Sequence, residues 1–204
     1  MRCDIRNCEG LFDPLSNHDI MLGLSEERKE KILKFKNEAD RKRSLMAGIM
    51  IRDNLAEYGI SQGDIKVTDN GRLYVDEAYN IDFNISHSGN YVLMVIGDGR
   101  LGCDIELVRD RNTSVAKRCF TKGELDWITK QDDETLGFYR IWTARESYAK
   151  MTGEGILLDF KKYGVCVVDN GEVEVYRESK KQDCIIEQYL YDNDYVISIC
   201  CEVL

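Results

Sequence analysis

The chain has very little proline, no long apolar run and few histidines. Its 204 residues include one proline, Pro14, and 16 glycines. No tract is rich in serine, glycine or proline, so a flexible linker is not expected. Residues 84–97 lie in an uncharged stretch that is shorter than the roughly 20 apolar residues that span a membrane. These absences favour a compact protein without a transmembrane helix.

The N-terminus and the cysteines indicate a reducing compartment. The first residues, MRCDIRNCEG, are polar and charged where a secretory signal needs an apolar run, so we expect the protein in the cytoplasm. The eight cysteines include no C-x-x-C pair, which argues against a zinc finger or a disulfide framework. Because most lie among apolar residues, they are predicted to be reduced core side chains.

The chain is acidic overall, with a formal net charge of −9. A general nucleic-acid binder needs a basic face, so this class is excluded, and no membrane partner is expected. One segment differs, because residues 26–43 carry eight basic and five acidic side chains. This local excess can bind a small polyanion; the alternative is a solvated helix surface without a ligand.

Two successive runs of helices followed by strands organise the chain. In the first half, Ser25 is predicted to cap one helix, and a second covers residues 39–58 and stops at Gly59. The strands predicted after them are 65–68, 72–75, 81–85, 91–96 and 101–108. In the second half, helices are predicted at 114–118, 122–129 and 134–151, then strands at 163–168, 172–177, 185–191 and 195–203. We therefore predict an α+β fold of two lobes, residues 1–102 and 103–204, each with helices packed on a mainly antiparallel sheet.

Asp104 and Glu106, in GCDIE, are two residues apart on a predicted strand. Both carboxylates therefore project from one face, while Cys103 and Ile105 point into the core. Two carboxylates this close repel each other unless a cation, a proton or basic side chains offset the charge, and Mg²⁺ is a common solution. The pair is a candidate metal site; the alternative is a solvated strand face.

WTARESYAK, residues 142–150, places Glu146 and Lys150 one helical turn apart on one face. This spacing is typical of an exposed ion pair. Trp142 lies on the same stripe, which favours a partly buried face. A third carboxylate near Asp104 and Glu106, with an ammonium beside it, can complete a site for a cation and a phosphate.

FNISHSG, residues 83–89, is a strand end running into a turn. It presents Ser86, His87 and backbone N–H groups to an anion, although a lone histidine is more often structural, as we expect for His18. The sequence contains no G-x-S-x-G elbow, P-loop, G-x-G-x-x-G or H-E-x-x-H, so the usual hydrolases, triphosphatases and dehydrogenases are excluded.

The chain contains, in this order, the basic helix, NGRLY, FNISHSG, GCDIE, FTKGE and WTARESYAK followed by GEGI. This series resembles the motifs of the 4'-phosphopantetheinyl transferases. The resemblance is to the larger, surfactin-synthetase-activating (Sfp-like) type and extends from Arg28 to Ile156. It implies two pseudosymmetric α+β lobes. The first binds the coenzyme A phosphates, and the second carries the metal ligands, the catalytic helix and the carrier-docking segment.

The resemblance implies Mg²⁺-dependent transfer of the 4'-phosphopantetheine arm from coenzyme A to a serine of an apo acyl or peptidyl carrier protein, releasing adenosine 3',5'-bisphosphate. The implied Mg²⁺ ligands are Asp104, Glu106 and Glu146. Glu146 is also the implied base for the carrier serine, and Lys150 the cation near the phosphate and the leaving group. The residues implied to hold the nucleotide phosphates are Arg28, Lys31, Arg43, Arg72, Ser86 and His87.

Phe120, Lys122, Leu125 and Trp127 are candidate contacts for the carrier protein, the alternative being that Phe120 and Trp127 are core residues. Arg145 stands where the family commonly has lysine. Two other functions stay open: a noncatalytic sensor of coenzyme A or a nucleotide, and an interaction domain. The fused two-lobe length makes a monomer the expected state.

Overall fold

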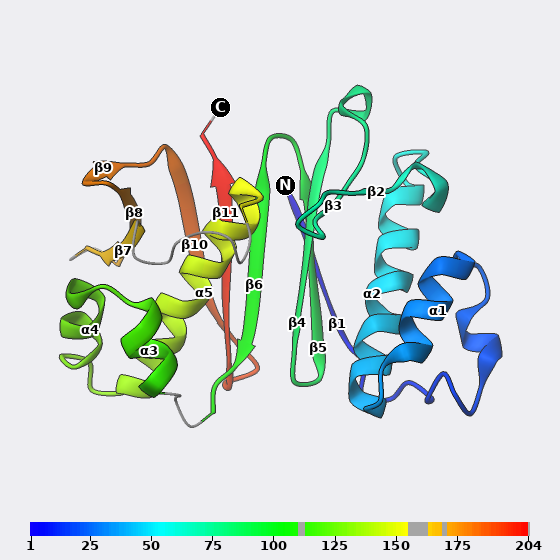
Figure 1. Ribbon diagram of the computed structural model, residues 1–204, viewed down its shortest axis with the longest axis horizontal. Coiled ribbons are helices and arrows are strands. Elements are labelled where there is room, and N and C mark those ends of the chain that lie inside the picture. The colour runs from blue at the N-terminus through cyan, green and yellow to red at the C-terminus, as the bar shows by residue number, and fades with distance from the viewer. Residues whose placement is uncertain (110–112, 155–162, 169–170, 204) are drawn as a thin grey trace. The chain divides into compact units, whose positions relative to one another are not determined.

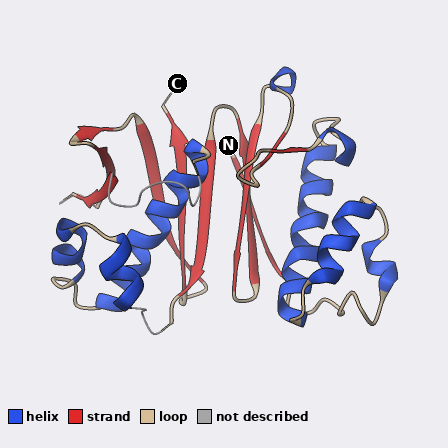
Figure 2. Ribbon diagram, viewed as in Figure 1, coloured by secondary structure: helices blue, strands red, loops and turns tan. Residues whose placement is uncertain are grey.

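The computed structural model describes residues 1–109, 113–154, 163–168 and 171–203. It divides into two compact units, Met1–Asp98 and Gly99–Leu204, and each combines helices with an antiparallel sheet (Figures 1 and 2). The predicted α+β class is thus confirmed. The division precedes β6 (Leu101–Leu107), whereas the sequence placed it after residue 102, because β6 pairs over its whole length with β11 (Tyr195–Glu202) of the second unit. Across the described ranges, no helix is both long enough and apolar enough to cross a membrane.

The first unit contains a three-stranded sheet in the order β1-β5-β4. Its strands are β1 (Arg2–Asn7), β4 (Asp82–Ser88) and β5 (Tyr91–Gly97), and a separate hairpin pairs β2 (Lys66–Val67) with β3 (Leu73–Tyr74). In Figure 1, α2 (Glu38–Ala56) lies between the sheet and α1 (Glu26–Lys34). Three 3₁₀ turns connect these elements: η1 (His18–Met21), η2 (Gln62–Asp64) and η3 (Glu77–Tyr79). Ser25 caps α1 as predicted, since its side chain accepts a hydrogen bond from the N–H of Arg28.

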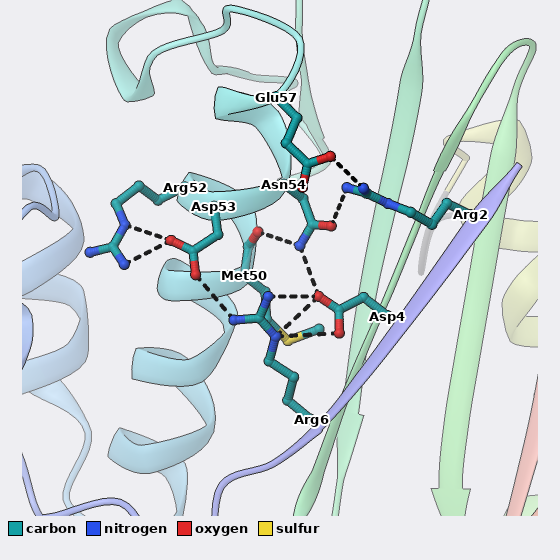
Figure 3. A network of polar contacts seen from close by, with 8 residues as sticks. All are labelled: Arg2, Asp4, Arg6, Met50, Arg52, Asp53, Asn54 and Glu57. Atoms are coloured by element: carbon teal, nitrogen blue, oxygen red, sulfur yellow. Dashed lines mark hydrogen bonds and ion pairs between the residues drawn. The ribbon is translucent and has the colours of Figure 1, made fainter.

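The edge strand β1, which the sequence analysis leaves unassigned, is attached to α2 by the polar network in Figure 3. Buried Asn54 is at its centre: its Nδ2 donates to Asp4 Oδ2 at 2.9 Å and to the Met50 carbonyl at 2.8 Å, and its Oδ1 accepts from Arg2 at 2.6 Å. Arg6 extends the network, because it contacts Asp4 and also donates to Asp53 Oδ2 of α2 at 3.1 Å. The charged side chains of β1 therefore attach this edge strand to α2.

The second unit has a six-stranded sheet in the order β6-β11-β10-β8-β7, with β9 paired to β8. Its remaining strands are β7 (Tyr163–Val167), β8 (Val173–Arg177), β9 (Lys180–Lys181) and β10 (Cys184–Tyr191). Its helices are α3 (Thr113–Cys119), α4 (Lys122–Ile128) and α5 (Glu134–Thr152). Figure 1 shows α5 crossing the sheet, where it packs on β6, β11 and β10. Gly153 ends α5 at φ 76°, as predicted, whereas residues 155–156 of GEGI lie outside the described residues.

All eight cysteines are free thiols. Cys8, Cys103, Cys119 and Cys200 are buried, and Cys184 and Cys201 are half-buried. Cys3 and Cys166 are exposed, so the prediction of core side chains is wrong for these two. They lie on β1 and β7, which are edge strands of their sheets, and an edge strand has one flank without a neighbouring strand to cover it.

Candidate active site

Gly102 lets α5 approach β6 much more closely than any other residue would allow. A Cβ atom at this position would lie 2.0 Å from the carbonyl oxygen of Ser147 and 2.4 Å from the amide nitrogen of Met151. The α5 backbone therefore rests directly on the strand backbone at the glycine of GCDIE. Because side chains alternate along a strand, Asp104 and Glu106 share this helix-facing side with Gly102.

This contact brings Asp104 and Lys150 together from segments far apart in the sequence. The Lys150 ammonium lies 2.6 Å from Asp104 Oδ1 and also donates to the Cys103 carbonyl at 3.1 Å. The Asp104 side chain is 5% exposed and that of Lys150 28%. Burial opposes the charge on Lys150, but Asp104 and Glu146 favour it, and the pKa of Lys150 is raised overall. Lys150 thus keeps its positive charge, supported by a buried carboxylate.

Glu146 is electrostatically coupled to this pair. Burial, followed by the charge of Asp104, raises the pKa of Glu146 above its ordinary value, while Lys150 and Arg145 act in the opposite direction. Glu146 lies one helical turn before Lys150 on α5, so both side chains belong to the face of the helix that carries the ion pair with Asp104. The predicted stripe is also confirmed at Trp142, which is half-buried and stacks on Phe138 with ring centroids 6.3 Å apart.

The three predicted carboxylates are not gathered into a tight cluster. Within the described part of the chain, no three histidine, cysteine, aspartate or glutamate side chains lie close enough together to hold a metal ion. Asp104 is engaged with Lys150, and Glu106 follows two residues later on the same side of β6. The chemistry of the set still fits Mg²⁺, because this ion is usually held by one or two carboxylates, with water and substrate phosphates as its other ligands.

In the first unit, Arg28 and Lys31 line a cleft of about 120 Å³ between α1 and the β2–β3 hairpin. Arg28 crosses Gly48 of α2, where a Cβ atom would lie 3.2 Å from its Nε, and donates to the Ser44 carbonyl at 3.0 Å. Burial lowers the pKa of Arg28. The remaining lining residues are Ser25, Glu27, Ile51, Gln62, Ile65, Val67 and Leu73. The cleft combines two cations with an apolar wall.

Arg43 and Arg72 are each held by an acidic neighbour. Arg43 pairs with Asp40 and donates to the carbonyl of Gly89 at 2.8 Å, at the turn after β4. Arg72 lies 2.5 Å from Asp82 at the start of β4. The structure therefore places both arginines beside β4, but not at the cleft of Arg28 and Lys31.

Ser86 and His87 are consecutive in β4, where they pair with Leu93 and Val92 of β5. Their side chains therefore point to opposite faces of the sheet. Ser86 is buried and His87 is exposed. β4 ends at Ser88 and a turn follows at Gly89, so FNISHSG is a strand end running into a turn, as predicted.

FTKGE has a role that the sequence analysis did not identify. Its glutamate, Glu124, is 1% exposed and forms an ion pair with Arg145 of WTARESYAK, which is 0% exposed. Phe120 is a core residue, as the alternative interpretation held, with Leu125 and Trp127 packed against the same cluster. Of the four candidate contacts for a carrier protein, Lys122 is exposed. A glutamate three residues after Thr121 is a capping-box pattern, which is the signal that the sequence offered.

Comparison with known proteins gives concordant matches over both units. Residues 100–200 match the 4'-phosphopantetheinyl transferase superfamily, and residues 16–97 match the family described as "4'-phosphopantetheinyl transferase, N-terminal". The chain is 30% identical over 195 residues to 4'-phosphopantetheinyl transferase Sfp of Bacillus subtilis, covering 92% of this chain and 87% of the relative.

A second relative, 4'-phosphopantetheinyl transferase gsp of Aneurinibacillus migulanus, is 28% identical over 184 residues, covering 87% of this chain and 76% of that protein. Among solved structures, holo-[acyl-carrier-protein] synthase (AcpS) of Neisseria meningitidis matches with a TM-score of 0.43 and 18% identity, over 51% of this chain and 98% of that one.

Proposed function

This chain belongs to the 4'-phosphopantetheinyl transferase family, which moves the 4'-phosphopantetheine arm of coenzyme A onto carrier proteins, and on that premise we propose how its own residues perform the transfer. The reaction joins a carrier serine hydroxyl to the β-phosphate of coenzyme A and releases adenosine 3',5'-bisphosphate. It requires removal of the serine proton and stabilisation of negative charge on the phosphoryl and leaving-group oxygens. The observation that carries the proposal is the ion pair between Asp104 of β6 and Lys150 of α5, one helical turn after Glu146.

Glu146 is the proposed proton acceptor, directly or through a water molecule. Its raised pKa brings it closer to the range of an effective general base than an exposed glutamate. Lys150 is proposed to contribute a fixed positive charge next to the phosphate and the leaving group. Its contact with Asp104 holds the ammonium in place before substrate arrives, so little reorganisation is needed.

Asp104, Glu106 and Glu146 are the proposed ligands of a divalent cation, Mg²⁺. When bound, this cation would neutralise charge on the pyrophosphate and polarise the phosphoryl oxygens. Asp104 and Glu106 are supported as ligands by their shared, helix-facing side of β6, and Glu146 by its coupling to Asp104. Since Lys150 already offsets the charge of Asp104, the site tolerates three carboxylates without extreme repulsion.

The residues proposed to hold the nucleotide phosphates are Arg28, Lys31, Arg43, Arg72, Ser86 and His87. Arg28 and Lys31 are the best supported, because they share a cleft and Arg28 carries its charge in a buried setting. Arg43 and Arg72 already contact Asp40 and Asp82, so binding of a phosphate there would compete with an existing partner.

The test is mass spectrometry of apo acyl and peptidyl carrier proteins incubated with the chain, coenzyme A and Mg²⁺. A serine-linked gain of the phosphopantetheine arm is expected, and Asp104→Ala and Glu146→Ala are expected to abolish it. Asp126→Ala, which removes an exposed carboxylate of α4, is the matched control. Folded D104A and E146A proteins that kept the rate of the control would show that the carboxylates are assigned wrongly.

The same experiment separates the enzyme from a noncatalytic sensor. A sensor gains thermal stability from coenzyme A but leaves every carrier unmodified. We further propose that the chain acts as a monomer in the cytoplasm. One chain carries both the basic cleft and the carboxylates, so no second copy is needed to supply either set. Light scattering during size-exclusion chromatography measures the mass in solution, and a dimer would contradict this point.

A further inference from the structure

The carboxylate of Glu124 is a junction of three elements. Its Oε2 accepts hydrogen bonds from the backbone N–H of Thr121 at 2.6 Å and from the Thr121 hydroxyl at 2.9 Å, which completes the capping box of α4. Its Oε1 accepts from the backbone N–H of Val165 in β7 at 2.8 Å. Nη1 of Arg145 in α5 donates to the two oxygens at 2.5 and 2.7 Å. One buried side chain thus joins α4, α5 and β7.

The guanidinium of Arg145 lies over two aromatic rings. Its Cζ atom lies 4.3 Å from the ring centroid of Tyr163 and 5.8 Å from that of Phe120. The Tyr163 hydroxyl in turn donates to the Arg145 carbonyl at 3.3 Å. Because the Arg145 guanidinium is planar, its paired carboxylate and the two aromatic rings together fix its position.

A buried ion pair is weak evidence for stability, because removing both charges from water offsets much of their attraction. Such a pair can instead fix the relative positions of the elements that carry it.

The geometry of α5 shows which side of this helix carries Arg145. With 3.6 residues per turn, two positions along a helix correspond to a rotation of about 200°, so Arg145 points to nearly the opposite side of α5 from Thr143 and Ser147. Thr143 and Ser147 face the sheet, since the Thr143 hydroxyl lies 2.7 Å from the Ser198 hydroxyl of β11 and the Ser147 carbonyl abuts Gly102. Arg145 therefore holds the side of α5 that faces away from β6 and β11 and toward α4 and the edge strand β7. Glu146 is the next residue along the helix.

We propose that Glu124 and Arg145 are positioning residues, whose contact sets the rotation of α5 and so directs Glu146 and Lys150 toward Asp104. This inference rests on the proposed function of those three residues. Neither Glu124 nor Arg145 touches a substrate in this scheme; they act through α5. The glutamate of FTKGE thereby serves the same reaction as WTARESYAK.

The test uses the full chain with two neutral replacements of similar size, Glu124→Gln together with Arg145→Met. Removing both charges avoids leaving one of them buried without a counterion. Arg145→Lys keeps the charge and is the rescue variant. Lys181→Met is the control, because it removes a surface ion pair of the same unit, between Lys181 and Glu174, on β8 and β9. For each protein we would measure thermal unfolding, kcat with an apo carrier, and Mn²⁺ affinity by electron paramagnetic resonance with coenzyme A present.

The expected result is a folded double variant whose kcat and Mn²⁺ affinity fall by roughly 10–100-fold, as is typical when groups that orient metal ligands are removed. R145K should retain most of both properties, and K181M all of them. Should the double variant fail to fold, Glu124→Asp withdraws the carboxylate by one methylene group while keeping both charges, and the same fall is expected.

A folded double variant, or a folded E124D protein, with the kcat and Mn²⁺ affinity of K181M would overturn the inference and leave the pair a structural feature. That outcome differs from failure of the proposed function. In the latter case the wild-type chain itself would neither bind Mn²⁺ nor modify any carrier, and this inference would be overturned with it.

Discussion

Gly102→Ala is the substitution with the most direct consequence for the candidate site. A Cβ atom placed 2.0 Å from the Ser147 carbonyl oxygen cannot be accommodated by a side-chain movement, because the atoms it meets belong to the α5 backbone. Ordinary van der Waals contact for a Cβ begins at 3.4 Å. The helix must therefore move away from β6 by about 1.4 Å, or the strand must distort by the same amount.

The size of the effect follows from this displacement. Overpacking of a core typically costs about 1–3 kcal/mol, which for a chain of this length lowers Tm by roughly 2–12 °C. Lys150 and Glu146 move with the helix, so the 2.6 Å contact between Lys150 and Asp104 is lost or lengthened. Because a misplacement of about 1 Å can cost about 100-fold in rate, we expect kcat to fall by that factor while the protein stays folded.

The assay is carrier loading followed by mass spectrometry, alongside thermal unfolding by circular dichroism. Gly123→Ala is the matched control, since a Cβ at this position in α4 meets no atom within 4 Å and alanine favours a helix by about 1 kcal/mol. It should leave kcat unchanged and raise Tm slightly. A G102A protein with the kcat and Tm of the wild type would refute the close approach of α5 to β6 as the origin of the site.

Three further predictions concern pH and polar contacts. Burial and the charge of Asp104 raise the pKa of Glu146 above 4.5, so the ionised carboxylate destabilises the folded state. Glu146→Gln should therefore raise Tm at pH 7, and this gain should vanish below about pH 4.5, where wild-type Glu146 is protonated in both the folded and the unfolded state. Thermal unfolding of both proteins over a series of pH values measures the difference. The hydrogen bond from Arg41 lowers the pKa of Asp13 to about 2, so Asp13→Asn should lower Tm at neutral pH. The difference in Tm from the wild type should shrink as the pH falls from 3.8 through about 2. A difference that stays constant over this range would contradict the pairing of Asp13 with Arg41. Asn54→Leu removes three hydrogen bonds of the network in Figure 3 and should cost about 1–3 kcal/mol, read from the urea midpoint; an unchanged midpoint would show that the network adds nothing to stability.

The local elements could be predicted from the sequence because their signals are local. Ser25 caps α1, and Gly153 stops α5 in a left-handed conformation, as their residue types and positions indicated. The strand β1 was missed, although Arg2, Asp4 and Arg6 alternate with Cys3 and Ile5 in the period of two that is typical of a strand. Only the facing surface of α2, with Asn54 and Asp53, shows how those charges are satisfied.

The residues of the candidate site could be predicted from the sequence, but the contacts between them could not. GCDIE and WTARESYAK identified Asp104, Glu106, Glu146 and Lys150 by residue type and spacing. FNISHSG offered Ser86 and His87 as candidate anion contacts, and the strand places their side chains on opposite faces. The predicted strand ended at residue 85, whereas pairing with β5 extends β4 to Ser88.

By itself, the sequence determined the order of most helices and strands, the caps, and the residue types that suit phosphoryl transfer, because each of these depends on neighbours within a few positions. The tertiary structure alone decided that α5 rests on Gly102, that Lys150 meets Asp104, and that Glu124 is paired with Arg145. These contacts join residues 21 or more positions apart. Their formation depends on how closely two backbones pack and on which buried charges find a partner, and neither property is written in any short segment of the chain.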